Sequence, residues 1–155
     1  MTMIGTVYGD LPDEDLEVAA AFWGAMLVEL RMQHGTLVPD WKAILVAFFR
    51  EGLARGESAV FGAQMGGTIV GTAAAFLNVH AASAIFPKPS ARLAGVYVLP
   101  EYRRLGIARG LTERAIAWCR TKDCAHVRLY ASPMGRPLYE SLGFVAGLEM
   151  RLNLG

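Results

Sequence analysis

A short basic segment containing a glycine, Arg103-Arg104-Leu105-Gly106-Ile107-Ala108, is the part of this chain best suited to chemistry. It follows an apolar run that stops at Pro100 and precedes residues with helical spacing, which predicts a turn that opens a helix. The first amides of a helix lack intrahelical partners and attract anions, phosphates above all. The small residues Gly106 and Ala108 allow a close approach to those amides, and the neighbouring arginines add positive charge. The segment therefore predicts a site for a phosphate or pyrophosphate.

Two other interpretations of this segment are open. It could be a plain strand–turn–helix connection whose arginines are merely solvated. It could also belong to a nucleotide-binding domain of the Rossmann type. The second reading is disfavoured because the chain has neither Gly-x-Gly-x-x-Gly nor the Gly-Lys-Ser/Thr of a P-loop at this position.

Two motifs in the sequence are similar to those of a known family. Arg103-x-x-Gly106-x-Ala108 resembles the Gln/Arg-x-x-Gly-x-Gly/Ala signature of the GNAT superfamily of N-acetyltransferases. Downstream, Leu138-Tyr139-Glu140-Ser141-Leu142-Gly143-Phe144 resembles the Leu-Tyr-Glu-x-Leu-Gly-Phe block of the same superfamily. Because two separate motifs occur in the right order, the chain is identified as a member of that superfamily.

The resemblance implies acetyl-CoA as the co-substrate and a fourth strand that splays from the fifth to receive the pantetheine arm. The backbone N–H of Val98 is then the expected donor to the thioester carbonyl. Ser132 stands where the family often has asparagine, and Gly135 stands where alanine is usual. The residues implied to bind the coenzyme are Val96, Tyr97, Val98, Arg103, Arg104, Leu105, Gly106, Ile107, Ala108, Arg109 and Ser132.

Tyr139 matches the general acid of the family, which protonates the departing thiolate as the C–S bond breaks. The other reading is a tyrosine packed on the side of a short helix. Many members also carry a glutamate base on the fourth strand, but the corresponding positions here are Leu93, Ala94 and Gly95. The base is thus open between His80, Glu29, another side chain and a chain of water molecules.

The resemblance implies direct transfer of an acetyl group, in a ternary complex, to a primary amine of a small molecule or a peptide. The missing glutamate motivates an alternative from another class, a catalytically weak or inactive acyl-CoA-binding sensor. The sequence does not identify the acceptor. Side chains in the regions that shape the family's acceptor cleft, most of them interpreted as packing, are Trp23, Trp41, Phe48, His80, Phe86 and Lys88. An acidic cluster for a polycationic acceptor is not evident, with Asp40, Glu51 and Glu57 as possible exceptions.

Hydrophobic periodicity predicts an α/β (α+β) domain with a mixed sheet flanked by helices, and the family resemblance makes that sheet mostly antiparallel. A Gly66-Gly67 pair between two apolar runs predicts a hairpin, and Asp10 is expected to cap the first helix. Gly143 is expected to end the last helix in a left-handed conformation. The predicted strands span about 2–8, 59–63, 69–77, 92–99, 127–129 and 148–154. The first predicted helix starts at Asp10–Asp13, runs through Leu30 and breaks at Gly35, and the others span about 39–54, 106–122 and 134–142.

Bulk properties narrow the classes further. A chain of 155 residues with 54% apolar residues fits a single domain over residues 1–155. A net charge of +1 argues against nucleic acid as a partner, and the short apolar runs argue against a membrane span. Scattered histidines predict no metal, and the close cysteines Cys119 and Cys124 are expected to be free thiols in the cytoplasm. The alternating tail could pair across a homodimer.

Overall fold

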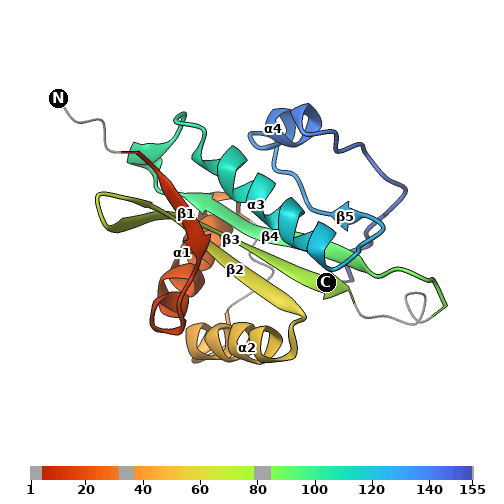
Figure 1. Ribbon diagram of the computed structural model, residues 1–155, viewed down its shortest axis with the longest axis horizontal. Coiled ribbons are helices and arrows are strands. Elements are labelled where there is room, and N and C mark those ends of the chain that lie inside the picture. Colours follow the sequence, from red (N-terminus) through yellow and green to blue (C-terminus); the bar gives the residue numbers. More distant parts are fainter. Residues whose placement is uncertain (1–4, 32–36, 79–84, 155) are drawn as a thin grey trace.

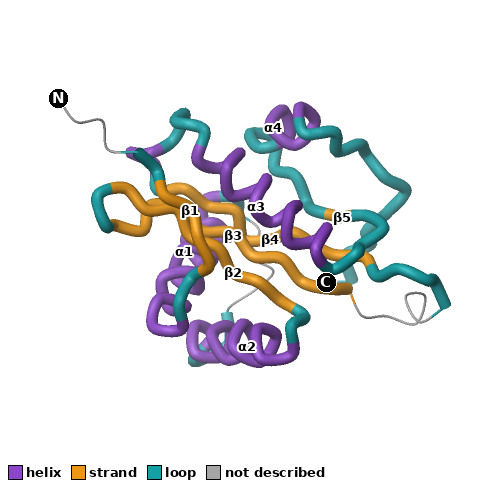
Figure 2. Tube along the Cα trace, viewed as in Figure 1, coloured by secondary structure: helices purple, strands orange, loops and turns teal. Residues whose placement is uncertain are grey.

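The fold is a five-stranded sheet between two layers of helices, seen in a computed structural model that describes residues 5–31, 37–78 and 85–154 (Figures 1 and 2). The strand order is β1-β2-β3-β4-β5; β4 and β5 run parallel and all other neighbours antiparallel. Short 3-10 turns cover Asp13–Asp15 and Pro100–Tyr102. The main elements are β1 (Val7–Asp10), α1 (Leu16–Glu29), α2 (Trp41–Arg55), β2 (Ser58–Met65), β3 (Thr68–Asn78), β4 (Ser90–Val98), α3 (Ile107–Thr121), β5 (Val127–Arg128) and α4 (Arg136–Ser141).

The sheet buries both of its faces. Helix α3 covers one face, and α1 and α2 cover the other (Figure 1). Strand β3 shows the consequence, because Ala73 and Ala75 pack toward α3 while Ala74 joins the cluster under α1 and α2. Successive side chains of a strand point to opposite faces. The prediction of a central strand that is apolar on both sides is confirmed.

The hairpin between β2 and β3 turns where the sequence predicts. Gly66 and Gly67 have φ angles of 58° and 79°, and Met65 lies opposite Thr68. Two successive residues with positive φ form the tight turn whose twist matches that of the flanking strands. This pair of glycines therefore fixes the register of the two central strands.

Strand β4 carries the irregularity that opens the sheet. Its register with β3 shifts between Thr72 and Ala74, where Gly95 adopts a φ of 64°. A Cβ on Gly95 would lie 2.6 Å from Cε3 of Trp23, so the glycine is needed both for its conformation and for the packing of α1. Beyond this bulge β4 no longer pairs with β5, and the implied splay of these two strands is confirmed. Their paired positions are Ala91 with Val127 and Arg92 with Arg128.

The structure corrects the sequence predictions at both ends of the chain. Among the described residues the first strand is Val7–Asp10, so Asp10 belongs to the sheet and is not a helix cap, and α1 begins only at Leu16. Residues 2–4 of the predicted strand and the break predicted at Gly35 lie outside the described residues. Residues 148–154, predicted as a strand, have no regular secondary structure. Alternation of apolar and polar residues alone does not make a strand, because the backbone groups of a strand need a neighbouring strand edge as hydrogen-bond partner. Strand β5 ends at Arg128 instead of at the predicted residue 129. The other predicted elements agree within a few residues, and Gly143 has the expected positive φ of 96°.

None of the helices in the described part of the chain is both long enough and apolar enough to span a bilayer.

Candidate active site

The N-terminus of α3 presents free backbone amides. Gly106 is the residue before the helix, with a φ of 79°, and no side chain caps this end. The first helical bond runs from Gly110 N to Gly106 O at 3.1 Å, which leaves the amides of Ile107, Ala108 and Arg109 without intrahelical partners. A Cβ added to Gly106 would meet no atom within 4 Å. The amides thus face open space, as a phosphate group would require.

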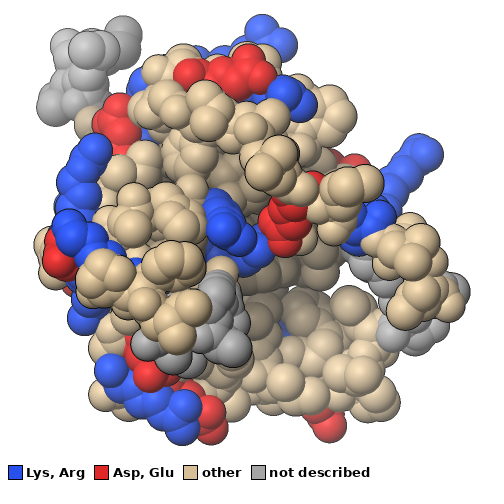
Figure 3. All heavy atoms as spheres, turned by 90° about the vertical axis from the view of Figure 1, so that its right-hand side faces the viewer, with Lys and Arg blue, Asp and Glu red and all other residues tan. Residues whose placement is uncertain are grey.

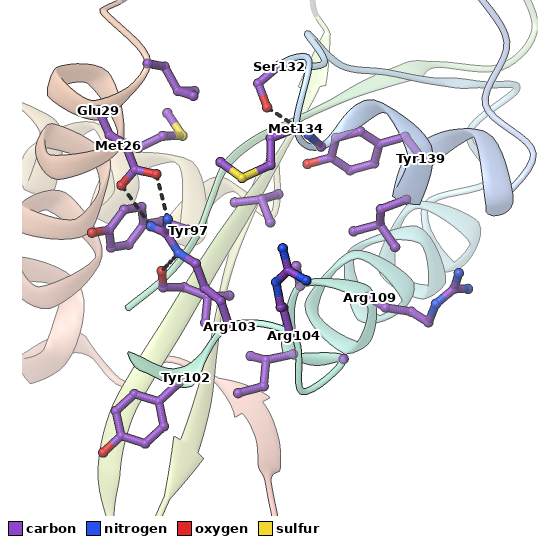
Figure 4. A pocket seen from close by; sticks show the side chains of 18 residues that line it. Met26, Glu29, Tyr97, Tyr102, Arg103, Arg104, Arg109, Ser132, Met134 and Tyr139 are labelled. Carbon is purple, nitrogen blue, oxygen red and sulfur yellow. Dashed lines mark hydrogen bonds and ion pairs between the residues drawn. The ribbon is translucent and has the colours of Figure 1, made fainter. Parts of the chain in front are cut away.

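The three arginines of the segment have different partners. Arg103 donates to both carboxylate oxygens of Glu29, Nη1 to Oε1 at 2.7 Å and Nη2 to Oε2 at 2.8 Å, and its Nε donates to Val98 O at 2.8 Å. Arg109 donates to the hydroxyl of Ser141. Arg104 has a positive φ of 63°, and its guanidinium extends into the cavity (Figure 4). Among the described residues Arg104 makes no ion pair, so its guanidinium is the available positive charge.

The edge of β4 that faces the splay offers the N–H of Val98. Leu99 N donates to Val70 O at 2.9 Å, while Val98 itself lies opposite Gly71. In an antiparallel pair this pattern marks a non-hydrogen-bonded position, so the backbone groups of Val98 point away from β3. The carbonyl of Val98 accepts from Arg103 at 2.8 Å on that side. Its N–H therefore points into the gap left by β5.

Tyr139 lies across the gap from these backbone groups, on the short helix α4 (Figure 4). Burial raises its pKa above the ordinary value of 10.0, so the phenol keeps its proton at neutral pH. A Cβ on Gly135 would lie 3.1 Å from Cε2 of the Tyr139 ring and 3.2 Å from Oγ of Ser132. The glycine that replaces the usual alanine thus lets the ring sit close to the backbone, and its N–H donates to Ser132 Oγ at 3.0 Å.

These groups surround one cavity of about 530 Å³, the main cavity. It brings together every residue that the sequence implies for the site except Leu105, whose exposed side chain points elsewhere. The α1 side of the wall, Met26 and Leu30, was missed because its apolar residues read as ordinary core spacing. The full lining is Met26, Glu29, Leu30, Val96, Tyr97, Val98, Tyr102, Arg103, Arg104, Gly106, Ile107, Ala108, Arg109, Ser132, Met134, Gly135, Leu138 and Tyr139.

A smaller hollow of about 190 Å³, the side pocket, lies between α1, β4 and the segment after β5. It shares Met26, Leu30, Val96, Ser132 and Tyr139 with the main cavity, so the two hollows adjoin. Its complete lining is Trp23, Met26, Leu27, Leu30, Arg92, Leu93, Ala94, Gly95, Val96, Leu129, Tyr130, Ser132 and Tyr139.

The residues that the sequence suggested for the acceptor cleft lie in different parts of the structure. Trp23 lines the side pocket, while Trp41 packs over Gly24 of α1. Phe48 contacts Phe76 at a tilt, with ring centroids 5.3 Å apart, but remains 55% exposed. Lys88 pairs with Asp123 at 3.1 Å, away from both hollows.

The structure bears on the side chains considered as general base or nucleophile. The hydrogen bonds from Arg103 hold the pKa of Glu29 below its ordinary value, which makes this carboxylate a weak proton acceptor. His80 lies outside the described residues. Cys119 and Cys124 are free, as expected, and burial raises the pKa of Cys119 to about 12, so neither is disposed to act as a nucleophile. In the described part of the chain, acidic, histidine and cysteine side chains do not gather into a group able to hold a metal ion.

The sequence profile of the Acetyltransferase (GNAT) family matches residues 16–144. The chain therefore belongs to the GNAT acetyltransferase family.

Individual relatives agree with this assignment. The sequence is 37% identical over 59 residues to an aminoglycoside N(6')-acetyltransferase type 1 from Acinetobacter baumannii, a match that covers 36% of this chain and only 40% of that relative. Two solved structures share the fold over nearly their full length. A predicted acetyltransferase from Clostridium acetobutylicum with acetyl-CoA has a TM-score of 0.81 and 23% identity, covering 97% of each chain. An aminoglycoside N-acetyltransferase in complex with CoA has a TM-score of 0.74 and 21% identity, covering 99% of this chain and 97% of that one.

Proposed function

We propose that this protein is an N-acetyltransferase that moves the acetyl group of acetyl-CoA to a primary amine by direct attack in a ternary complex. The observation that carries the proposal is the main cavity, which is lined by the first residues of α3, by Val98 and by Tyr139. Backbone donors suit an anionic cofactor and a carbonyl that gains charge, and a protonated phenol suits a thiolate leaving group.

The coenzyme residues have separate tasks in this proposal. The amides of residues 104–109, with the Arg104 guanidinium, hold the pyrophosphate. The edge of β4 at Val96, Tyr97 and Val98 pairs with the pantetheine arm in place of a further strand. Ser132 lines the same wall from the segment after β5, and Arg103 keeps α1 against the loop through Glu29.

The chemical step forms an N–C bond and breaks a C–S bond. The amine nitrogen attacks the thioester carbon while Val98 N–H stabilises the charge that develops on the carbonyl oxygen. As the C–S bond breaks, the Tyr139 hydroxyl gives its proton to the sulfur. The amine loses a proton to water, because Ala94 and Gly95 replace the usual carboxylate and Glu29 is held ionised by Arg103.

The test is calorimetric titration of the full chain with acetyl-CoA, free CoA, NAD and ATP, followed by thiol release with a panel of amines. We expect stoichiometric binding of the two CoA species alone and thiol release with at least one amine. Binding of NAD or ATP without CoA would reject the proposed site.

A sensor that binds acyl-CoA without turnover is the second candidate function, favoured by the missing carboxylate on β4. The retained Tyr139, with its raised pKa, speaks for catalysis. Saturable CoA binding without thiol release on any amine would favour the sensor.

We further propose that residues 1–155 act as one domain in the cytoplasm, where free thiols persist. The tail motivates a homodimer. Leu148, Met150, Leu152 and Leu154 alternate along it and are each at least 81% exposed. Leu148 and Met150 also line a hollow whose opposite wall includes β5. Figure 3 shows the end of the molecule that carries this tail, where charges of both signs are scattered over a mostly uncharged surface. Light scattering of the full chain and of a chain cut after Gly147 tests the dimer, which the truncation should dissociate.

A further inference from the structure

The side pocket is apolar on two of its walls. Helix α1 contributes Trp23, Met26 and Leu27, and β4 contributes Ala94. Its volume of about 190 Å³ is below the range of about 300–1,000 Å³ that accommodates drug-sized ligands. An acceptor that enters it must therefore carry a slim apolar portion rather than a bulky polar ring system.

Arg92 is the one charged residue among the described residues that line this pocket. It lies at the last position where β4 pairs with β5, so the two strands begin to diverge beside it. Its guanidinium lies over the ring of Tyr130, 4.8 Å from the ring centroid, and its side chain is only 26% exposed. Carboxylates, by contrast, are missing from the described lining.

A carboxylate already lies beside this pair of side chains. Oε1 of Glu149, on the tail, is 3.7 Å from Nη2 of Arg92 and accepts a hydrogen bond of 3.4 Å from the hydroxyl of Tyr130. Both distances are long for such contacts, and residue 149 belongs to no strand or helix that would hold it there. Arg92 and Tyr130 thus offer a carboxylate site whose present partner is weakly held.

The carboxylate site and the wall shared by the two hollows lie along the same strand. Arg92 precedes Val96 by four positions, which amounts to about 13 Å of strand at roughly 3.3 Å per residue, and the bulge at Gly95 lies between them. Val96, Ser132 and Tyr139 line both hollows, so a chain lying in the side pocket ends beside the main cavity.

We infer that the acceptor is an amino carboxylate, with its amine and its carboxylate at the two ends of an apolar spacer. Arg92 and Tyr130 take the carboxylate, the apolar walls take the spacer, and the amine reaches the thioester beside Tyr139. This inference rests on the proposed acetyltransferase function. It differs from a polycationic acceptor, which would call for acidic walls; the described lining residues of the side pocket supply none, and Asp40, Glu51 and Glu57 line neither hollow.

Three acceptors of one chain length test this inference: ω-aminohexanoate, hexylamine and hexane diamine. They place a negative, a neutral or a positive group at the end remote from the reacting amine. The measurement is kcat/KM from thiol release with acetyl-CoA, for the wild type, Arg92→Gln and Arg128→Gln. Arg128 is the register neighbour of Arg92 on β5 and does not line the side pocket, so it is the matched control.

We expect the wild type to prefer ω-aminohexanoate over hexylamine by about tenfold, the factor that a charge-assisted hydrogen bond typically carries, and to use hexane diamine least. Arg92→Gln should abolish this preference through KM while hexylamine turnover stays within about twofold, and Arg128→Gln should preserve it. Unchanged hexylamine turnover also shows that the variant is folded. A preference for the diamine, or an equal loss on all three amines, would overturn the inference.

Glu149→Gln provides a second measurement. If the tail carboxylate only occupies the site in the absence of acceptor, its removal should lower the KM for ω-aminohexanoate. A raised KM for hexane diamine would instead show that Glu149 recognises cationic acceptors, which contradicts the inference. Thiol release with ω-aminohexanoate that is unchanged in Arg92→Gln leaves the acetyltransferase standing and rejects only the carboxylate site. Coenzyme binding without turnover of any amine rejects the transferase, and the inference falls with it.

Discussion

The main cavity presents mostly backbone groups to its proposed ligand, whereas the side pocket presents mostly side chains. In the main cavity the donors are the amides at the start of α3 and the N–H of Val98. In the side pocket the recognition falls to Arg92, Tyr130 and apolar walls. Binding through backbone groups requires glycine and small residues at fixed positions, so it leaves a recognisable motif in the sequence. Side-chain recognition leaves no fixed spacing, so acceptor choice can change while the coenzyme site persists.

The largest effect, a loss of CoA affinity, should come from blocking the backbone amides at the start of α3. Gly106→Glu places a carboxylate where the phosphate is proposed to bind, so CoA affinity should fall by at least about a hundredfold in calorimetric titration. Gly67→Glu is the matched control, because Gly67 shares the φ of 79° and the open surroundings but lies at the hairpin tip. Equal losses in the two variants would mean that strain, not the phosphate site, is responsible.

Removing the hydroxyl of Tyr139, which lines both hollows, tests its proposed role as general acid. Tyr139→Phe should lower kcat by about a hundredfold, as loss of a general acid typically does, and leave CoA affinity within about twofold. Because burial raises the pKa of Tyr139, the wild-type rate should fall only as the pH rises beyond 10.0, where the phenol loses its proton. The variant should lack that alkaline decline. Wild-type turnover in Tyr139→Phe would assign the ring to packing.

Gly95 forms the bulge of β4 that lies between the main cavity and Arg92. Gly95→Ala should destabilise the fold by about 1–3 kcal/mol, since its Cβ would overlap Trp23. Gly67→Ala adds a Cβ at a similar positive φ in open space and isolates the backbone strain. Urea unfolding of the two variants gives the difference. Equal losses would mean that Trp23 moves without cost.

The smallest effect should follow from breaking the contact between Arg103 and Glu29. This pair is partly exposed, so Glu29→Gln should cost no more than about 1 kcal/mol of stability in thermal unfolding. Glu29 is already ionised at neutral pH because Arg103 lowers its pKa, so its loss should not move the acidic limb of kcat/KM. Asp13→Asn breaks a bidentate pair with Arg50 far from the cavity and is the matched control. A shifted acidic limb in Glu29→Gln alone would identify Glu29 as the base.

Local chemistry made much of this molecule predictable. The Gly66-Gly67 turn, the helix after Gly106 and the left-handed end at Gly143 each depend on residues next to one another in the chain. The residues implied by the two motifs also converge, with the exception of Leu105. Met26 and Arg92 could not be assigned from sequence, because their roles depend on how α1 and the segment after β5 meet. The strand predicted for the tail was wrong for the same reason. Alternating residues form a strand only where a sheet edge is available for pairing.

The two paired positions between β4 and β5 leave the far end of β4 with an open row of backbone groups. A ligand that pairs with this row binds the ordered strand and not its opened form, so mass action makes coenzyme concentration a determinant of local rigidity. At a concentration one hundred times its Kd, such a ligand adds about 2.7 kcal/mol against opening. The amide protons of β4 beyond the bulge would then exchange with solvent at rates that report how much coenzyme surrounds the protein.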